Sequence, residues 1–142
     1  MTIAGFDHAA IPTDEPARLI AFYRALGFII RGEEAFNAGD QPYFSIVFGP
    51  NKINVHGPRL WRNEQFTLRA PAAKPGCGDF CFVWEGTSEA LQAALESADA
   101  PIEVGPVERE GGRGGGAQAG TSIYTRDPDG NLLEFISYAA SP

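Results

Sequence analysis

Glu134 is the residue whose surroundings point most directly to chemistry. It belongs to the segment RDPDGNLLEF, residues 126–135, in which a turn-forming stretch leads into an apolar run typical of a strand. A carboxylate among apolar neighbours requires a partner, because burying an unpaired charge is costly. The chain has only two histidines, His8 and His56, and both lie in short apolar segments. Imidazole nitrogens together with a carboxylate favour a divalent ion such as Fe, Mn, Zn, Ni or Co.

Residue parity predicts which of these side chains share a face of a sheet, because successive side chains of a strand point to opposite faces. In the segment that ends at His56, polar residues alternate with Ile53 and Val55, so the imidazole lies on the polar face. Asp79 alternates in the same way with large aromatic residues. The ligand-type residues expected on the faces away from the helices are His8, His56, Asp79 and Glu134.

Two runs of elements with the same order are expected to position these residues. Strands are predicted over residues 6–11, 28–31, 43–48 and 52–56 in the first run, and over 79–84, 102–109, 121–126 and 132–138 in the second. In each run a helix follows the first strand. It begins near Pro16 and stops at Gly27 in one run, and it begins after Thr87 in the other. The predicted fold class is α+β, with two tandem β-α-β-β-β modules that form a curved mixed sheet around a concave site.

The two modules are expected to form a single domain over residues 1–142, which is long enough for one hydrophobic core. Module one covers about residues 1–65 and module two about residues 79–142. A linker rich in Pro, Ala and Gly, about residues 66–78, separates them. The repeated order of elements therefore predicts a duplicated unit.

Composition narrows the range of partners. A net charge of −7 disfavours nucleic acid and anionic membranes. No apolar run approaches the roughly 20 residues that span a bilayer, and the first residues show no secretory signal, so a cytoplasmic location is expected. Cys77 and Cys81 fit neither a disulfide framework nor half of a zinc ribbon, and they are predicted to be free thiols.

Four segments carry a family resemblance: DHAAIPTDEPARLIAFYRALGF, FGPNKINVHGP, PGCGDFCFVW and YTRDPDGNLLEF. The chain resembles the vicinal oxygen chelate (VOC) superfamily, which includes glyoxalase I, fosfomycin-resistance enzymes, methylmalonyl-CoA epimerase, extradiol dioxygenases and bleomycin-binding proteins. The resemblance covers essentially the whole chain, and its most specific part is the DPDGN turn followed by a glutamate. It implies paired β-α-β-β-β modules that close around one metal ion, and it implies a homodimer.

The resemblance assigns site residues by their position in the chain. His8 matches the family's first-strand histidine, and Glu134 matches its last-strand glutamate. His56 falls on the fourth-strand position that is usually Glu or Gln, and Asp79 falls on the fifth-strand position that is usually His. The expected metal ligands are therefore His8, His56 and Glu134. Asp79 is expected to be a ligand, a residue that orients a ligand, or neither.

Arg113, Tyr124 and Arg126 are the candidates for substrate binding. Arg113 is the charged residue of GGRGGGAQAG, residues 111–120, which is predicted to be a mobile loop over the pocket. There it would hold an anionic group of the substrate or simply be solvated. Tyr124 and Arg126 share a face of a strand that lines the pocket in the resembled family. Arg126 is also an alternative partner for Glu134.

The function predicted from the residues and the resemblance is that of a metal-dependent enzyme. It would chelate neighbouring oxygens of a small molecule, in a reaction of the glyoxalase, lyase or isomerase type, with Glu134 or Asp79 as catalytic base. One alternative is an Fe(II)-dependent dioxygenase, and another is a metal-free binding protein of the bleomycin-resistance type. The sequence leaves open whether the site lies within one chain or is shared between the subunits of a homodimer.

Overall fold

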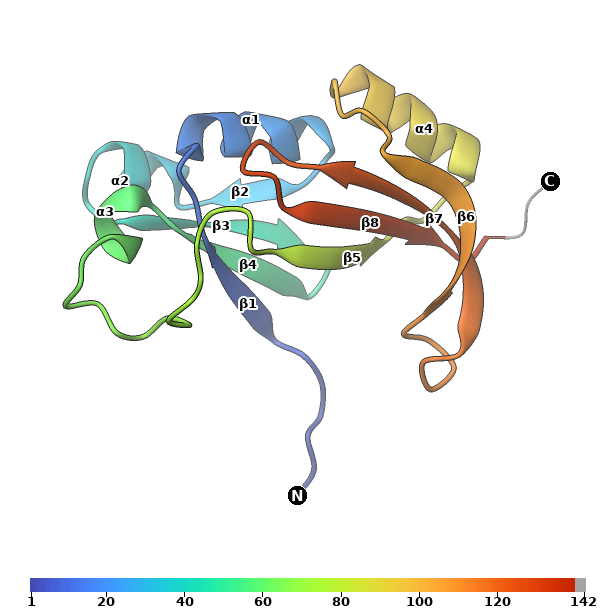
Figure 1. The fold of residues 1–142 in the computed structure, drawn as a ribbon, viewed down its shortest axis with the longest axis horizontal. Coiled ribbons are helices and arrows are strands. Elements are labelled where there is room, and N and C mark those ends of the chain that lie inside the picture. Colours follow the sequence, from blue (N-terminus) through green and yellow to red (C-terminus); the bar gives the residue numbers. More distant parts are fainter. Residues whose placement is uncertain (140–142) are drawn as a thin grey trace. The chain divides into compact units, whose positions relative to one another are not determined.

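The computed structural model describes residues 1–139, which form two compact units. The first unit is Met1–Cys77 and the second begins at Gly78. Each unit contains one four-stranded mixed sheet (Figure 1). The end of the predicted second module, residues 140–142, lies outside the described part of the chain.

The first unit builds its core between one helix and one face of its sheet. Its elements are β1 (His8–Pro12), α1 (Pro16–Ala25), β2 (Ile29–Arg31), α2 (Glu33–Asn37), β3 (Tyr43–Phe48), β4 (Asn51–His56) and α3 (Pro58–Trp61). The sheet order is β1-β4-β3-β2, with β1 parallel to β4 and the other neighbours antiparallel. Leu19 and Tyr23 of α1 are fully buried, and so are Phe44, Ile46 and Val55 of the sheet. The polar side chains of β4 therefore lie on the opposite face.

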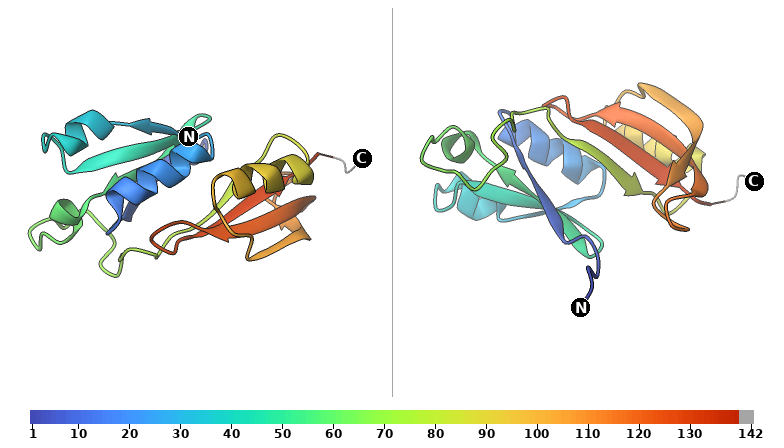
Figure 2. Two further views of the ribbon diagram at one scale, coloured as in Figure 1. Left: turned by 90° about the horizontal axis from the view of Figure 1, so that it is seen from above. Right: turned by 60° about the horizontal axis from the view of Figure 1, so that its bottom comes forward.

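The second unit repeats this plan (Figure 2). Its elements are β5 (Asp79–Val83), α4 (Ser88–Ser97), β6 (Val104–Gly111), β7 (Gln118–Arg126) and β8 (Leu132–Ser137). The sheet order is β5-β8-β7-β6, and β5 is parallel to β8. The Thr87 hydroxyl accepts a hydrogen bond from the Ala90 N–H at 3.2 Å and so caps α4. Leu91 and Leu95 of this helix are buried together with Leu133 of β8 in the core.

The predicted α+β class and the doubled β-α-β-β-β order are confirmed. The strands are divided between two sheets rather than forming one curved sheet, because every strand pair in residues 1–139 joins strands of the same module. The short helices α2 and α3 were not predicted, since five and four residues are too few to show a helical period. None of the helices in the described chain is long and apolar enough to cross a membrane.

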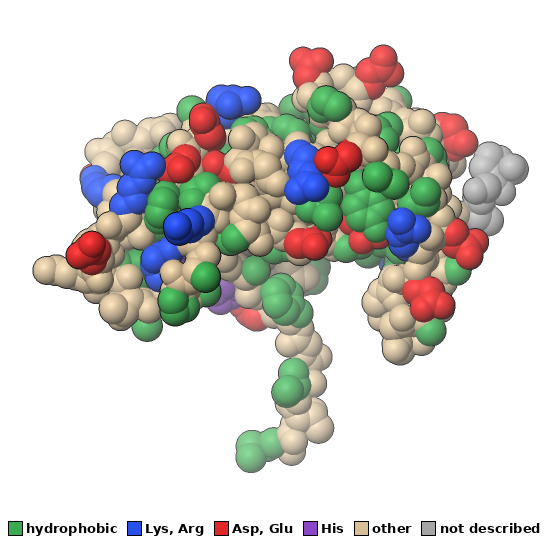
Figure 3. Space-filling view, in the orientation of Figure 1, with side chains coloured by type: hydrophobic (Ala, Val, Ile, Leu, Met, Phe, Trp, Pro, Cys, Tyr) green, Lys and Arg blue, Asp and Glu red, His purple; other side chains and the backbone are tan. Residues whose placement is uncertain are grey.

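The residues before β1 form an extended segment with exposed apolar side chains. Ile3 and Phe6 are 96% and 72% exposed, and Figure 3 shows hydrophobic side chains along this segment. β1 is an edge strand of its sheet, so one side of its backbone has no neighbouring strand within the unit. An exposed edge with apolar residues beside it is a surface on which another chain can pack.

Candidate functional site

Glu134 lies on the side of β8 that faces away from the core. Its neighbours Leu133 and Phe135 are buried whereas Glu134 is half-buried, as the alternation along the strand predicted. In the sheet it stands opposite Cys81 of β5 and Tyr124 of β7. The Tyr124 hydroxyl donates a hydrogen bond to Glu134 Oε1 at 2.9 Å. The carboxylate is therefore positioned by the strands on both sides of it.

Proton donors surround this carboxylate. Arg109 Nε donates to the Tyr124 hydroxyl at 3.2 Å, and its guanidinium lies 5.7 Å from the centre of the Tyr124 ring. Burial and then the hydrogen bond to Glu134 raise the pKa of Tyr124. Cys81 is exposed as a residue, but burial of its thiol and then the charge of Glu134 raise its pKa to about 12. Both groups stay protonated at neutral pH, so Glu134 is the acceptor of the cluster.

The turn before β8 is held together by a buried carboxylate. Asp127 Oδ1 accepts hydrogen bonds from the backbone N–H groups of Asp129 and Asn131, each at 3.0 Å. Asp127 Oδ2 accepts from Asn131 Nδ2 at 2.7 Å. Gly130 has a φ of +91°, a conformation that favours glycine, and it donates its N–H to the Asp127 carbonyl at 2.9 Å. The side chain of Asn131 is thereby fixed.

Asn131 connects this turn to the start of β5. Its Oδ1 accepts the Gly78 N–H at 2.7 Å, and the Leu132 N–H donates to the Gly78 carbonyl at 3.0 Å. A Cβ on Gly78 would come within 2.8 Å of Asn131 Oδ1, so a glycine is needed for this close approach. The two strands are joined at their first residues, and the resulting register places Glu134 opposite Cys81.

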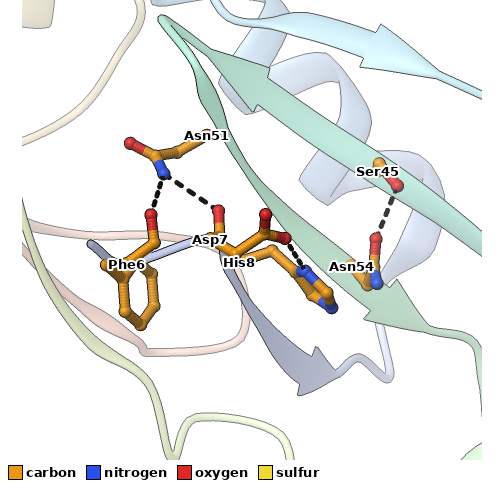
Figure 4. Close-up of polar contacts among 6 residues, drawn as sticks. All are labelled: Phe6, Asp7, His8, Ser45, Asn51 and Asn54. Atoms are coloured by element: carbon orange, nitrogen blue, oxygen red, sulfur yellow. Dashed lines mark hydrogen bonds and ion pairs between the residues drawn. The ribbon is translucent and has the colours of Figure 1, made fainter. Parts of the chain in front are cut away.

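His8 begins β1, and the preceding residue orients its imidazole. His8 Nδ1 donates to Asp7 Oδ1 at 2.5 Å (Figure 4), so in the neutral imidazole Nε2 carries the lone pair that a metal ion needs. Asn51 Nδ2 holds the backbone here by donating to the carbonyls of Phe6 and Asp7 at 2.8 and 2.9 Å. The Asp7 side chain is 93% exposed and the His8 side chain 44%, so the pair adds little stability and its effect is orientation.

His56 lies at the other end of the β1–β4 pair from His8. The register sets His8 beside Lys52 and His56 beside Pro12. The two histidines are thus four ladder positions apart, about 13 Å along the strands. Within residues 1–139, neither imidazole belongs to a group of three or more His, Cys, Asp or Glu side chains that could hold a metal ion.

Apolar residues surround His56 instead. Its ring meets the Phe66 ring edge-on, with 5.3 Å between centres. Burial and then the charge of Arg69 lower the pKa of His56, so the imidazole is neutral at neutral pH. Asn54 lies on the same face of β4, and its Oδ1 accepts the Ser45 hydroxyl at 2.9 Å (Figure 4). This end of β4 therefore combines an amide and a neutral imidazole with an apolar surface.

Arg126 is not the partner of Glu134. It forms an ion pair with Glu103 at 3.2 Å and donates to the Gly130 carbonyl at 3.2 Å. The partner of Glu134 is therefore the Tyr124 hydroxyl rather than Arg126. Parity placed Arg126 and Tyr124 on one face, but the sequence contained no signal for the contact with Glu103 across the sheet.

The remaining predicted residues lie apart from one another in the second unit. The Arg113 guanidinium lies 4.4 Å from the centre of the Tyr138 ring, a cation–π contact. Asp79 is exposed at the start of β5 and shares a face with Cys81, whose pKa its charge also raises. Asp79 therefore lies close to Cys81 and Glu134. Arg113 is held instead by the Tyr138 ring, near the point where its loop leaves β6.

Within residues 1–139, no three His, Cys, Asp or Glu side chains are grouped closely enough to hold a metal ion. The predicted histidines belong to the first unit and the predicted carboxylates to the second. Sequence reasoning did not identify Asp7 or Arg109. A carboxylate directly before a candidate ligand histidine is a usable signal for Asp7, but Arg109 reaches Tyr124 only through the pairing of β6 with β7.

The family of the chain follows from comparison with known proteins. Residues 5–135 match the family model of the Glyoxalase/Bleomycin resistance protein/Dioxygenase superfamily. The chain therefore belongs to this superfamily, the VOC superfamily that the sequence resemblance indicated.

Two relatives are similar over nearly the whole chain. Glyoxalase domain-containing protein RDO1 of Mycosarcoma maydis is 32% identical over 138 residues, which cover 97% of this chain and 70% of that protein. Virulence protein STM3117 of Salmonella typhimurium is 32% identical over 139 residues, which cover 97% and 87%. Its crystal structure matches with a TM-score of 0.79 over 98% of this chain and 100% of that one. A lactoylglutathione lyase from Agrobacterium tumefaciens, 19% identical with a TM-score of 0.66 over 96% of each chain, shares the fold.

Proposed function

We propose that the protein is a metal-dependent enzyme that acts on a small molecule with two neighbouring oxygens, in a glyoxalase-, lyase- or isomerase-type reaction. The observation that carries the proposal is the Glu134 carboxylate. It is held on an open sheet face by Tyr124, and none of the ion pairs within residues 1–139 includes it. Membership of a superfamily that includes such enzymes supports the proposal.

The proposed metal ligands are His8 and Glu134, each of which is described within its own unit. The hydrogen bond from His8 Nδ1 to Asp7 leaves Nε2 as the nitrogen available to a metal ion, and Glu134 keeps Oε2 beside the oxygen that Tyr124 occupies. One nitrogen and one carboxylate suit Fe, Mn, Zn, Ni or Co. When bound, such an ion acts as a Lewis acid on the oxygens of the substrate. His56, the third ligand predicted from the sequence, is omitted from this set because about 13 Å of strand separates it from His8.

The other residues of the Glu134 face have roles that follow from their contacts. Tyr124 and Arg109 hold the carboxylate in place, because each donates a hydrogen bond along the series that ends at Glu134. Asp79 is the proposed catalytic base. It is exposed on the same face as Cys81 and Glu134, and it takes part in none of the ion pairs of the described chain.

A homodimer is proposed as the working form. The exposed residues Ile3 and Phe6 beside the edge strand β1 support it, because a second copy of the chain would cover apolar surface there.

Metal titration of the chelator-treated full-length protein by calorimetry tests the donor set. We expect stoichiometric binding of at least one of Mn, Fe(II), Co, Ni and Zn. His8→Ala and Glu134→Gln should each lower the affinity at least about tenfold. Two control variants should leave the metal affinity unchanged. One is His56→Ala, and the other is Glu108→Gln, which changes an exposed carboxylate in the sheet that contains Glu134.

Two results would contradict parts of this proposal. A protein that binds none of these ions, and whose unfolding temperature none of them raises, would not be a metal enzyme and would fit the metal-free binding class. Loss of affinity in His56→Ala would return His56 to the ligand set. Oxygen uptake by the Fe(II)-loaded protein with catechols would replace the lyase or isomerase class with a dioxygenase.

A further inference from the structure

A pocket of 350 Å³ lies at the end of β4, entirely within the first unit. Its lining residues are Pro42, Tyr43, Asn54, His56, Leu60, Phe66 and Leu68. They come from β3 and the residue before it, from β4, from α3 and from the segment that follows α3. Tyr43 stands opposite His56 in the sheet, so the floor of the pocket is the face of β4 that points away from the core. A volume of this size holds one ring with a small substituent.

The walls of this pocket are apolar and partly uncovered. Leu68 is 85% exposed and Tyr43 is 43% exposed, although both are large hydrophobic residues. Phe66 presents its ring to the pocket while it contacts His56 edge-on. Exposed aromatic and aliphatic side chains around a concavity favour a flat apolar ligand, which removes their surface from water.

The polar groups of the pocket favour an acidic oxygen. Asn54 Oδ1 is occupied by the Ser45 hydroxyl, and Asn54 Nδ2 has no protein acceptor within residues 1–139. The ring nitrogens of His56 have no hydrogen-bond partner in the same part of the chain. The Arg69 charge acts on this imidazole, and Arg69 Nε is buried without a partner within the described residues. A positive charge that disfavours an imidazolium favours an anion at the same place.

We propose that this pocket binds a small aromatic carboxylate, with the ring between Phe66 and Leu68 and the carboxylate oxygens on Asn54 Nδ2 and His56. In this proposal, His56 binds the small molecule and is not a ligand of a metal ion. The pocket and His8 lie on the same face of the β1–β4 pair. Identifying the occupant of the pocket as the substrate of the enzyme rests on the proposed function. Binding itself needs no metal.

Nuclear magnetic resonance titration of the full-length protein in the presence of EDTA tests the proposal. The probes are benzoate, benzyl alcohol, which lacks the charge, and acetate, which lacks the ring. We expect benzoate to shift the signals of His56, Phe66 and Leu68, benzyl alcohol to bind more weakly, and acetate not to bind. Benzoate should also raise the pKa of His56, because an anion at hydrogen-bonding distance favours the imidazolium.

Variants separate the two parts of the ligand. Leu68→Ser should weaken benzoate binding about fivefold, whereas Ile29→Ser, which changes another exposed apolar residue of the unit, should not. Arg69→Gln should remove the preference for benzoate over benzyl alcohol, and Arg69→Lys should retain it. Shifts spread over the surface, an unchanged His56 pKa, or equal effects of Leu68→Ser and Ile29→Ser would overturn the proposal. Because EDTA is present throughout, these outcomes do not depend on whether the metal proposal is correct.

Discussion

Replacing Asn131 with alanine tests the argument that the turn before β8 positions Glu134. The substitution removes two hydrogen bonds: the buried one from Asn131 Nδ2 to the Asp127 carboxylate and the partly buried one from the Gly78 N–H to Asn131 Oδ1. The bond to the charged carboxylate contributes about 1.5–3 kcal/mol and the neutral bond about 1 kcal/mol. Asn131 is completely buried, so water does not replace the lost side chain without rearrangement. We therefore expect the free energy of unfolding to fall by about 3 kcal/mol.

Urea unfolding followed by circular dichroism measures this loss. The control is Asn63→Ala, because Asn63 is exposed and its side-chain Oδ1 accepts the Gln65 N–H at 3.1 Å. It should cost no more than about 0.5 kcal/mol. If Asn131→Ala also cost less than about 1 kcal/mol, the connection between the turn and Gly78 would not hold the two strands in register, and the account of how Glu134 is positioned would be wrong.

Two further predictions concern the neighbours of Glu134. Tyr124→Phe removes the hydrogen bond that orients the Glu134 carboxylate and should weaken metal binding about tenfold. The control Tyr43→Phe should leave the metal affinity unchanged. Calorimetry measures the affinity of both variants, and equal affinities would show that Tyr124 does not position Glu134. In Cys77→Ser protein, the rate at which a disulfide reagent modifies Cys81 should rise about tenfold per pH unit up to about pH 10, because the thiolate reacts and the pKa is about 12. Glu134→Gln should speed this reaction at a given pH by removing a negative charge, and a rate that levels off near the ordinary thiol pKa of 9.0 would contradict the predicted environment.

Most of the features that could be predicted follow from local patterns in the sequence. The alternation of side chains along β8 placed Glu134 on the face away from the core, and alternation along β4 did the same for His56. The repeated order of strands and helix predicted both units. The DPDGN motif predicted a turn because proline fixes φ and glycine permits a positive φ, and the structure adds the contact from Asn131 to Gly78.

The features that could not be predicted from the sequence depend on contacts between strands. Parity shows which face a residue occupies but not which residue stands beside it on the next strand. The four-position offset between His8 and His56 and the ion pair of Arg126 with Glu103 both depend on such neighbours. The pocket at His56 depends on Phe66 and Leu68, which lie in a segment without regular structure and therefore show no period.

The sequence by itself determined the α+β repeat and the faces on which His8, His56 and Glu134 lie, because these follow from periodicity and turn chemistry within a few residues. Its resemblance to known members indicated the superfamily. Only the tertiary structure decided that Tyr124 and Cys81 flank Glu134 and that His56 faces an apolar pocket. The physical reason is that strand register is set by hydrogen bonds between distant segments. A shift of a few residues leaves each local pattern intact but changes every neighbour across the sheet.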